Sequence, residues 1–548
     1  MVKSLIILLR FDNGDSPYDP KSTGTVDNYL IPVGLAYISA TLTKAGKDVS
    51  VLNLNNHEGL LQDILVNELE KGFNDLIFLG GLSLYYPHIR DIIKYLRYYS
   101  PQSKIVVGGG IITAQPEIAF RYLQPDFGVI GEGEQTCLEL INCLEKGGYL
   151  PGVPGVIFSD SFGAITITEP RKPIMDLDAL PFPDYESFGY REYLDKVKIT
   201  DMGGLLDVVD NPRPYPLLAS RSCVYSCTFC FHPLGQKYRQ RPIDNVMDEI
   251  RMAVKKYRVN IILFYDEMFS HDKERVLEFC KKFKAYSDTL PNKLWFQCQN
   301  RVDTTTDEML KVMKESGAFL LSYGLESYSP TVLASMKKNI TPEQIDRTAR
   351  LTRENKLGFQ GNFIFGDVAE TCETAKETLD YVRQNRELLG SSIGLYFIIP
   401  FQGTPIYKQL VKSGKIPNEI RFIKDREQNW FKYLEPTNLT SLSEDKFERL
   451  KDAVFGLHLV SDTYAQPEGL WYNSPGDTYA VIKCPSCKTS FSMKNIPRPK
   501  GFGALVIGCR HCHYRFHLVS KWYPLKRAII KLFGFRRVYW LQNKVKKG

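Results

Sequence analysis

The chain has 548 residues, of which 43% are hydrophobic and 24% are charged, as in ordinary globular proteins. This length suits about three or four domains. No run of about 18 uninterrupted apolar residues occurs, so no transmembrane helix is expected. The first residues lead straight into a short apolar run without a signal-peptide pattern, which predicts a cytoplasmic protein. The net charge of +8 is modest, and much of it lies near the C-terminus.

Twelve cysteines in a chain without an export signal argue against a disulfide scaffold and favour metal or redox chemistry. Seven of them fall into two groups with the spacing of metal ligands. The remaining ones are scattered and are predicted to be buried spectators: Cys137, Cys143, Cys280, Cys298 and Cys372.

Residues 1–150 alternate short apolar runs with segments of helical length. The apolar runs fit buried parallel strands at 5–9, 48–54, 76–79, 104–107 and 128–130. Helices are expected between them, for example at 34–45 and 87–99. These units predict an α/β fold, here a doubly wound, Rossmann-like domain that binds its ligand beyond the strand ends.

The rest of the chain divides into further segments. A linker rich in proline and turn residues is expected at 151–205. Residues 206–410 predict a partial (β/α)6 barrel, with strands near 217–219, 261–265, 294–297, 320–324, 361–365 and 394–399. A helical extension (411–475), a small zinc ribbon (476–518) and a basic amphipathic tail (519–548) are expected to follow.

The most informative segment is a loop after the first barrel strand, where catalytic groups of such barrels lie. It contains Cys223, Cys227 and Cys230 in the spacing C-x3-C-x2-C. Three thiolates are one short of the four that usually hold a [4Fe–4S] cluster, so one iron would stay open for another ligand. The spacing alone leaves a zinc site, with His232 as fourth ligand, as the alternative.

This loop, with an aromatic residue before the third cysteine, resembles the cluster loop of the radical S-adenosylmethionine (SAM) enzymes. The resemblance implies that the open iron binds the amino and carboxylate groups of SAM. It implies further that an electron from the cluster cleaves SAM to methionine and a 5′-deoxyadenosyl radical. The electron would come from a donor such as flavodoxin or ferredoxin.

Later barrel segments resemble the SAM-binding signatures of the same family. A carboxylate at a strand end is a natural partner for an ammonium or a ribose hydroxyl, and a surface or ion-pair carboxylate is the plainer alternative. The fifth-strand pattern departs from the family at Val368, where proline is common. The SAM contacts that the resemblance implies are Phe229, Glu267, Arg301, Glu326, Ser327 and Gly366.

Three segments at strand ends of the front domain resemble the cobalamin-binding domains of class B-type radical SAM methyltransferases. Glycine lets the backbone approach a bulky nucleotide tail. The implied cobalamin contacts are Ser83, Leu84, Gly108, Gly109, Gly110, Gly131, Glu132, Gly133 and Glu134. The loop at 11–28 lacks the histidine of cobalt-ligating Asp-x-His-x-x-Gly loops, and His57 is expected to be an ordinary loop residue.

The C-terminal part carries a second cysteine array. Cys484, Cys487, Cys509 and Cys512 form two C-x2-C pairs separated by 21 residues, the pattern of a structural zinc ribbon. A second iron–sulfur cluster is the alternative. Residues 521–548 interleave basic and aromatic residues and contain no acidic residue. Such a segment can dock on its own chain, lie on an anionic membrane or, third, bind RNA.

The leading hypothesis is a cobalamin-dependent radical SAM methyltransferase that acts on an unactivated carbon of a small-molecule or lipid-like substrate. One SAM would supply the radical, methylcobalamin the methyl group, and a second SAM would remethylate the cobalamin. A cyclase or rearrangement enzyme of the same architecture is the first alternative. A tRNA methylthiotransferase would need three front-domain cysteines, where only Cys137 and Cys143 occur. A non-catalytic zinc-ribbon adaptor that binds membrane or nucleic acid is the alternative from another class.

Overall fold

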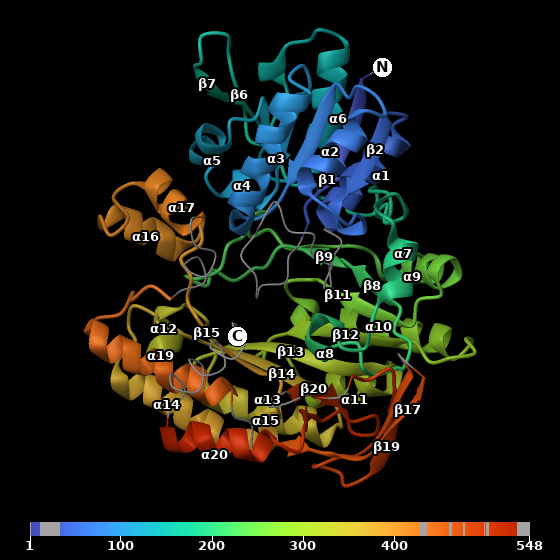
Figure 1. Ribbon diagram of the computed structural model, residues 1–548, viewed down its shortest axis with the longest axis vertical. Coiled ribbons are helices and arrows are strands. Elements are labelled where there is room, and N and C mark those ends of the chain that lie inside the picture. Colours follow the sequence, from blue (N-terminus) through green and yellow to red (C-terminus); the bar gives the residue numbers. More distant parts are fainter. Residues whose placement is uncertain are drawn as a thin grey trace.

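A computed structural model gives the architecture (Figure 1). An α/β domain at one end lies above the strand ends of a second α/β unit, and a small β module with helix α20 (Tyr523–Phe533) lies at the other end. No helix in the part of the chain that the structure describes is long and apolar enough to cross a membrane. The described residues are 2–10, 33–427, 436–459, 463–474, 477–497, 499 and 504–533.

The front domain is built on a seven-stranded sheet in the order β2-β1-β3-β4-β5-β6-β7. The first five strands are parallel and match the predicted runs: β1 (Lys3–Leu8), β2 (Asp48–Asn53), β3 (Leu76–Gly80), β4 (Lys104–Gly108) and β5 (Phe127–Val129). Along β1, Ile6 and Leu8 join one buried cluster, and Leu5 and Ile7 join another. Both faces of the sheet are therefore covered, as in a doubly wound fold.

Helices cover this sheet on both faces (Figure 1). They are α1 (Val33–Lys44), α2 (Leu61–Leu69), α3 (Tyr86–Tyr99), α4 (Gly110–Ala114), α5 (Pro116–Leu123) and α6 (Gly133–Glu145). The expected helices at 34–45 and 87–99 correspond to α1 and α3.

The sheet continues into the segment that was assigned to a linker. Strands β6 (Val156–Ser159) and β7 (Ile165–Ile167) add to it in antiparallel order. Next come η4 (Glu186–Phe188), α7 (Tyr190–Lys196) and α8 (Asp201–Gly204). The Tyr185 hydroxyl donates to the Pro216 carbonyl at 3.0 Å, and the Asn53 amide donates to the Phe188 carbonyl at 2.7 Å. This stretch is an ordered bridge that contacts both α/β units.

The second unit contains six parallel strands in chain order, as a partial barrel requires. The strands are β8 (Pro214–Leu217), β11 (Ile261–Phe264), β12 (Trp295–Asn300), β13 (Ala318–Glu326), β14 (Gly358–Phe365) and β15 (Ile393–Phe397). Their helices are α9 (Ile243–Tyr257), α10 (Lys273–Ser287), α11 (Asp307–Ser316), α12 (Pro330–Ser335), α13 (Pro342–Glu354), α14 (Cys372–Gln384) and α15 (Arg386–Leu389).

The first barrel strand differs from the expectation. The strand predicted near 217–219 ends at Leu217, because the following residues form a separate hairpin. Strand β9 (Ser220–Arg221) pairs in antiparallel order with β10 (Arg239–Gln240). The cysteine loop is therefore the connection within this hairpin.

Two helices after the barrel return to the front domain (Figure 1). They are α16 (Pro405–Lys412) and α17 (Glu419–Glu427), and α17 packs on α3 and α5. Ile423 is fully buried in a core cluster of the front domain. Helix α19 (Glu444–Leu459) packs on α14 and β15. The predicted helical extension also contains β16 (Tyr464–Ala465) and β17 (Pro467–Ser474).

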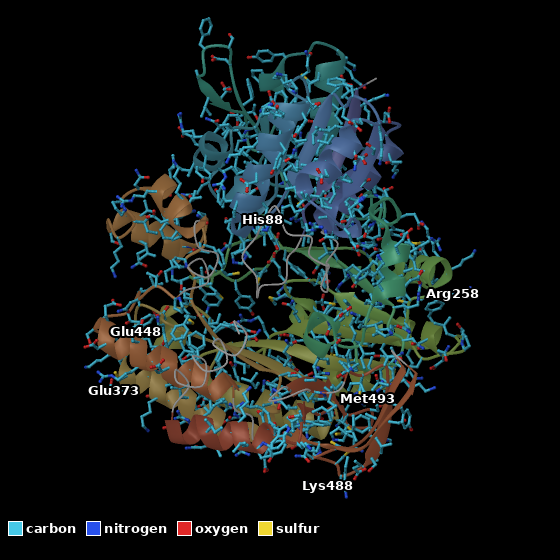
Figure 2. The ribbon with its side chains drawn as sticks, in the orientation of Figure 1. His88, Arg258, Glu373, Glu448, Lys488 and Met493 are labelled. Atoms are coloured by element: carbon cyan, nitrogen blue, oxygen red, sulfur yellow. The ribbon has the colours of Figure 1, made fainter. Side chains whose placement is uncertain are left out.

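The C-terminal module consists of two small sheets, β17-β18-β19 and β16-β21-β20. The additional strands are β18 (Asp477–Lys483), β19 (Ser490–Lys494), β20 (Ala504–Gly508) and β21 (Arg515–Val519). The module docks below the amino ends of the barrel strands: the Ser391 amide donates to the Arg515 carbonyl at 2.9 Å. Arg515 also pairs with buried Asp207 at 2.8 Å. Lys488 and Met493 mark this end of the molecule, far from His88 of the front domain (Figure 2).

Four cysteines of this module form a compact thiol cluster. The Sγ atoms of Cys484 and Cys512 are 3.8 Å apart, and those of Cys487 and Cys509 are 3.7 Å apart. All four lie within 4.8 Å of one another, which is the geometry for one tetrahedral zinc ion. His513 packs instead on the barrel, 5.5 Å from the Trp295 ring, where burial lowers its pKa to about 3.

We expect zinc to stabilise the whole chain through this docked module. Cys509→Ser should remove zinc and lower the melting temperature by at least about 5 °C, because metal binding energy is folding energy and the barrel floor loses its cover. Metal analysis and thermal unfolding measure both effects. Cys372→Ser, at an exposed cysteine, is the control. Full zinc content with unchanged melting in Cys509→Ser would contradict this prediction.

Candidate functional site

The cysteine loop begins from a constrained residue. Ser222 is 2% exposed and has a φ of 72°, in the left-handed region that costs most residues energy. Its hydroxyl donates to the Leu234 carbonyl at 3.2 Å and accepts from Arg239 Nη2 at 3.1 Å. These contacts tie both ends of the loop together immediately before Cys223.

The three predicted cluster cysteines share this loop in the protein interior. Cys227 is buried, and Cys223 and Cys230 are half-buried. Burial raises the pKa of Cys223 and of Cys227. Within the described residues, the compact single-ion geometry belongs to the C-terminal cysteines and not to this trio. A wider spread suits a cluster in which each thiolate binds a different iron. The residues therefore fit a three-ligand cluster.

His232 lies two residues after Cys230 and beside Glu267. Its Nδ1 lies 3.7 Å from a carboxylate oxygen of Glu267. Cys230 and Glu267 together raise the pKa of His232 to about 10.

Segments from other parts of the barrel hold the cluster loop. The Thr228 amide donates to the Met336 carbonyl, and the Ile406 amide donates to the Thr228 carbonyl, each at 3.0 Å. Phe229 packs against an apolar cluster that includes Met336 and Tyr407. The predicted SAM contact at Phe229 thus lies at the edge of a core.

Two further predicted SAM contacts have protein partners. Arg301 is 5% exposed, bonds Asp303 at 2.9 Å and lies 3.5 Å over the ring of Tyr225 in the cluster loop. Glu326 forms a buried ion pair with Lys338 at 2.7 Å. A Cβ on Gly324 would lie 2.6 Å from the Lys338 ammonium, so glycine makes room for this pair.

The remaining predicted SAM contacts lie at the same edge of the barrel. Glu267 has a side chain that is 37% exposed. Ser327 Oγ lies 3.1 Å from Thr378 Oγ1. Gly366 has a φ of 88°, and its amide donates to the Glu370 carboxylate at 2.5 Å. Of the predicted carboxylates, Glu267 is therefore the accessible one.

The front-domain glycines mostly serve close packing. A Cβ on Gly109 would lie 2.9 Å from the Gly81 carbonyl, and one on Gly133 would lie 2.9 Å from Ile38. Gly131 faces open space, with a φ of 79°. Ser83 and Leu84 lie in the short helix η2 (Ser83–Tyr85), with Ser83 buried.

The two units meet at the cluster loop. A Cβ on Gly110 of the front domain would lie 3.4 Å from the Phe231 ring, next to Cys230. A Cβ on Gly403, after the last barrel strand, would lie 2.5 Å from the same ring. Gly108, before this turn, has ordinary space beside Val129. Phe231 thus fills a contact point between both units.

Exposed apolar side chains occur on these facing loops. Leu82 is 55% exposed, Val224 in the cluster loop is 42% exposed, and Val368 after β14 is 38% exposed. An apolar cofactor face or substrate would cover them. Together with the open space beside Gly131, they fit a bulky cobalamin.

The histidine-free loop at 11–28 lies outside the described residues. His57 is described and belongs to a surface loop, where partial burial lowers its pKa.

Glu132 and Glu134 make contacts that the sequence did not reveal. Both carboxylates are buried and pair with arginines of the β9–β10 hairpin, Arg221 and Arg239. Lys338 and Ser222 are likewise important residues that the sequence analysis missed. No short motif marks them, because their side-chain partners Glu326 and Arg239 belong to other segments, 12 and 17 residues away in the chain.

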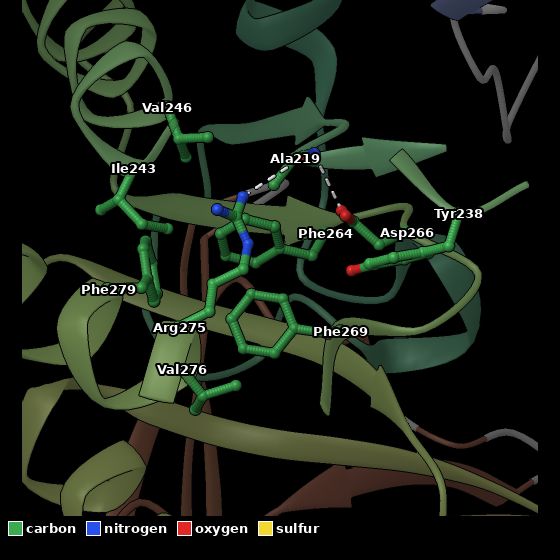
Figure 3. A pocket seen from close by; sticks show the side chains of 10 residues that line it. All are labelled: Ala219, Tyr238, Ile243, Val246, Phe264, Asp266, Phe269, Arg275, Val276 and Phe279. Atoms are coloured by element: carbon green, nitrogen blue, oxygen red, sulfur yellow. Dashed lines mark hydrogen bonds between the residues drawn. The ribbon is translucent and has the colours of Figure 1, made fainter. Parts of the chain in front are cut away.

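A small cavity lies beneath the hairpin (Figure 3). Asp266 accepts from the Ala219 amide at 3.0 Å, and Arg275 donates to the Ala219 carbonyl at 3.2 Å. Apolar side chains such as Phe269 and Phe279 line the rest. Burial raises the pKa of Asp266 to about 6. The bonds of Asp266 and Arg275 to Ala219 hold the chain in place directly after β8.

The scattered cysteines differ in burial. Cys137, Cys280 and Cys298 are buried as predicted. Cys143 is half-buried and Cys372 is exposed, so the prediction is wrong for these two. Cys143 packs at the edge of the main core near the end of α6, whereas Cys372 is the exposed first residue of α14.

The buried carboxyl of Glu370 generates a pH prediction. Burial, with Asp367 nearby, raises the pKa of Glu370 from 4.5 to about 8. The folded chain then keeps a proton that the unfolded chain releases, so this group lowers the free energy of unfolding as pH rises from about 4.5 to about 8, by up to about 1.4 kcal/mol per pH unit. Glu370→Gln should be increasingly stabilised relative to wild type across this window.

Unfolding midpoints at several pH values measure this effect. Glu373→Gln, at an exposed carboxylate at the start of α14 (Figure 2), is the matched control and should show no such gain. Parallel pH profiles of Glu370→Gln and wild type would refute the assignment.

Comparisons with known proteins agree with this architecture. The Radical SAM superfamily model matches residues 217–382, and the B12 binding domain model matches residues 22–141. The methyltransferase PH0819 of Pyrococcus horikoshii is 26% identical over 410 residues, 73% of this chain and 81% of its own length. An anaerobic magnesium-protoporphyrin IX monomethyl ester cyclase of Rubrivivax gelatinosus is 27% identical over 359 residues, 64% of this chain and 62% of that protein.

A solved structure shows the same fold. The radical SAM methyltransferase TsrM of Kitasatospora setae, with cobalamin and a [4Fe–4S] cluster bound, superimposes with a TM-score of 0.60 at 18% identity. The match covers 75% of each chain. With both family models in this order and a fitting three-cysteine loop, the chain belongs to the cobalamin-dependent radical SAM family of enzymes, which includes methyltransferases.

Proposed function

We propose that this enzyme methylates an unactivated carbon of a small, largely apolar molecule, with a [4Fe–4S] cluster, SAM and cobalamin as cofactors and zinc as a structural ion. The bound cofactors supply a 5′-deoxyadenosyl radical and a transferable methyl group. The observation that carries the proposal is the contact at Phe231: the residue after Cys230 lies against Gly110 of the B12-binding domain. Both cofactor sites therefore border one space.

The chain's own residues would bind and orient the cofactors. Cys223, Cys227 and Cys230 would hold the cluster and leave one iron open. Glu267, the accessible carboxylate beside the loop, would bind the SAM ammonium. Glu326 and Arg301 would contribute through the pairs that they already form, and Ser327 and the turn at Gly366 would border the nucleoside.

The cobalamin would lie beyond β3, β4 and β5. Ser83, Leu84, Gly108–Gly110, Gly131 and Gly133 would border it, and the space beside Gly131 is open. Leu82 and Val224 would face its ring or the substrate, since both are large exposed apolar side chains. The substrate would share this apolar surface, which excludes water around a reactive radical.

A cyclisation or rearrangement without methyl transfer is the second candidate. It is favoured by the relative that is a cyclase, which is 27% identical over 64% of this chain. Product analysis separates the two: methyl transfer converts the second SAM to S-adenosylhomocysteine, whereas cyclisation does not. Either reaction needs a one-electron donor such as a flavodoxin or ferredoxin.

The cluster test is anaerobic reconstitution with iron, sulfide and hydroxocobalamin. Wild type should bind about four irons at the loop and form 5′-deoxyadenosine from SAM under reduction. Cys227→Ala should abolish 5′-deoxyadenosine while keeping zinc. Cys143→Ala is the control. Undiminished 5′-deoxyadenosine in Cys227→Ala, or no cluster absorbance in wild type, would overturn the proposed chemistry.

We also propose that a cytoplasmic enzyme of this kind contacts anionic membranes through its tail. Helix α20 docks on the chain through buried Tyr523 and Ile530, while Trp522 and Leu525 stay 51% and 49% exposed. Lys521 lies beside them, and residues 521–533 contain no acidic residue. Residues 534–548 of the basic tail lie outside the described part. Aromatic and basic groups together suit an anionic surface.

Vesicle flotation tests the tail. Trp522→Ser with Leu525→Ser should reduce flotation with anionic vesicles by roughly tenfold, as two lost apolar anchors would give. Phe162→Ser, at a side chain that is 95% exposed on the β6–β7 turn, is the control. Equal flotation of all three proteins would end the membrane proposal.

A further inference from the structure

A group of four buried charges joins the two cofactor domains. Glu132 and Glu134 follow β5 of the B12-binding domain, and Arg221 and Arg239 belong to the hairpin that carries the cluster loop. The four side chains belong to residues that are 3–8% exposed. Two carboxylates face two guanidinium groups, so the group is neutral as a whole.

Glu132 is the centre of this group. It accepts from Arg221 Nη1 at 2.7 Å, from Arg239 Nη1 at 2.7 Å and from the Ile174 amide at 2.6 Å. Glu134 accepts from Arg221 Nη2 at 2.6 Å. One carboxylate therefore joins the front domain, the ordered bridge and both strands of the hairpin.

The arginines connect this group to the cluster loop. Arg221 is two residues before Cys223 and lies 5.1 Å over the Tyr37 ring of α1. Arg239 donates to the Ser222 hydroxyl at 3.1 Å and to the Ile174 carbonyl at 2.8 Å. Movement of the front domain would thus pull on the residue directly before the first cluster ligand.

A buried ion pair is a costly way to gain stability but a selective way to fix geometry. Apolar contacts tolerate sliding, whereas charge-assisted hydrogen bonds at 2.6–2.7 Å hold both distance and direction. We propose that Glu132, Glu134, Arg221 and Arg239 form an interdomain latch that fixes the spacing between the cobalamin and the cluster. They are positioning residues, and this role rests on the proposed function because it requires both cofactors.

The latch assigns Glu132 and Glu134 a role different from direct cobalamin contact.

The test uses two variants, Glu132→Gln alone and Glu132→Gln combined with Arg239→Gln. The double variant is charge-balanced: it leaves no unpaired buried charge and keeps the Glu134–Arg221 pair. The control, Asp207→Asn with Arg515→Gln, breaks an equally buried pair between barrel and zinc ribbon.

Pulsed paramagnetic resonance of reconstituted, reduced protein gives the readout. In wild type, the reduced cluster should speed relaxation of the cob(II)alamin signal, because the two spins are close. In both latch variants, cobalamin and iron contents should remain at wild-type levels while this enhancement falls to less than half. The control should keep it.

Hydrogen exchange of the cofactor-free proteins provides a second readout. Exchange in segments 127–136 and 220–240 should become at least about tenfold faster in the latch variants and not in the control. Loss of cobalamin binding with unchanged exchange would show direct cofactor contact and overturn the latch. Unchanged spectra and exchange would also overturn it. A wild type that binds no cobalamin contradicts the proposed function, and exchange alone then decides the latch.

Discussion

The left-handed backbone of Ser222 is the constraint on which the functional end of this protein depends. Such a conformation costs a non-glycine residue about 1–2 kcal/mol and persists only where neighbours fix it. Here the neighbours are Leu234 and Arg239, which bond the Ser222 hydroxyl. Arg239 is itself held by Glu132 of the other domain. A strained turn, the hairpin and the B12-binding domain thus share one chain of hydrogen bonds.

The two ends of the barrel are used differently. At the carboxyl ends, charged side chains and glycines position a loop of cysteines against the front domain. At the amino ends, the zinc ribbon closes the barrel through the Asp207–Arg515 pair and the packing of His513 on Trp295. The ribbon therefore lies away from the cluster loop, and we expect it to contribute to the stability of the barrel.

Local patterns in the sequence predicted the parallel strands of both α/β units and the grouping of the four C-terminal cysteines. The apolar run at β1 and the C-x2-C pairs are local signals, and the structure contains both the strand and a compact group of four thiols. The end of β8 was misplaced because Leu218 and Ala219 continue the apolar run of Leu217, although Asp266 and Arg275 bond the Ala219 backbone and Asp266 also accepts from the Ser220 hydroxyl, where the hairpin begins. Strands β6 and β7 were missed because turn residues surround them.

The contacts of Glu132 could not be read from the sequence, since Arg221 lies 89 residues away and a strand-end glutamate suits a cofactor equally well. The same holds for Lys338, which is an unremarkable turn residue until the fold places it beside Glu326. Side chains whose function depends on a distant partner carry no local signature.

The existing pairs also bear on how SAM can bind. Releasing Glu326 from Lys338 or Arg301 from Asp303 would leave a buried charge alone, which costs about 3–5 kcal/mol. Glu267 is held less firmly: its side chain is 37% exposed, and Nδ1 of its partner His232 lies at 3.7 Å, beyond hydrogen-bond distance. The ammonium group of SAM would therefore bind Glu267 at the least cost in free energy.

Glu326 and Arg301 are better suited to hold the cluster loop in a fixed position. Arg301 stacks on Tyr225 of this loop, and Lys338, the partner of Glu326, follows Met336, whose carbonyl accepts from the Thr228 amide. The cluster loop would then have the same geometry with and without SAM, so that SAM binding would not displace the three cysteines.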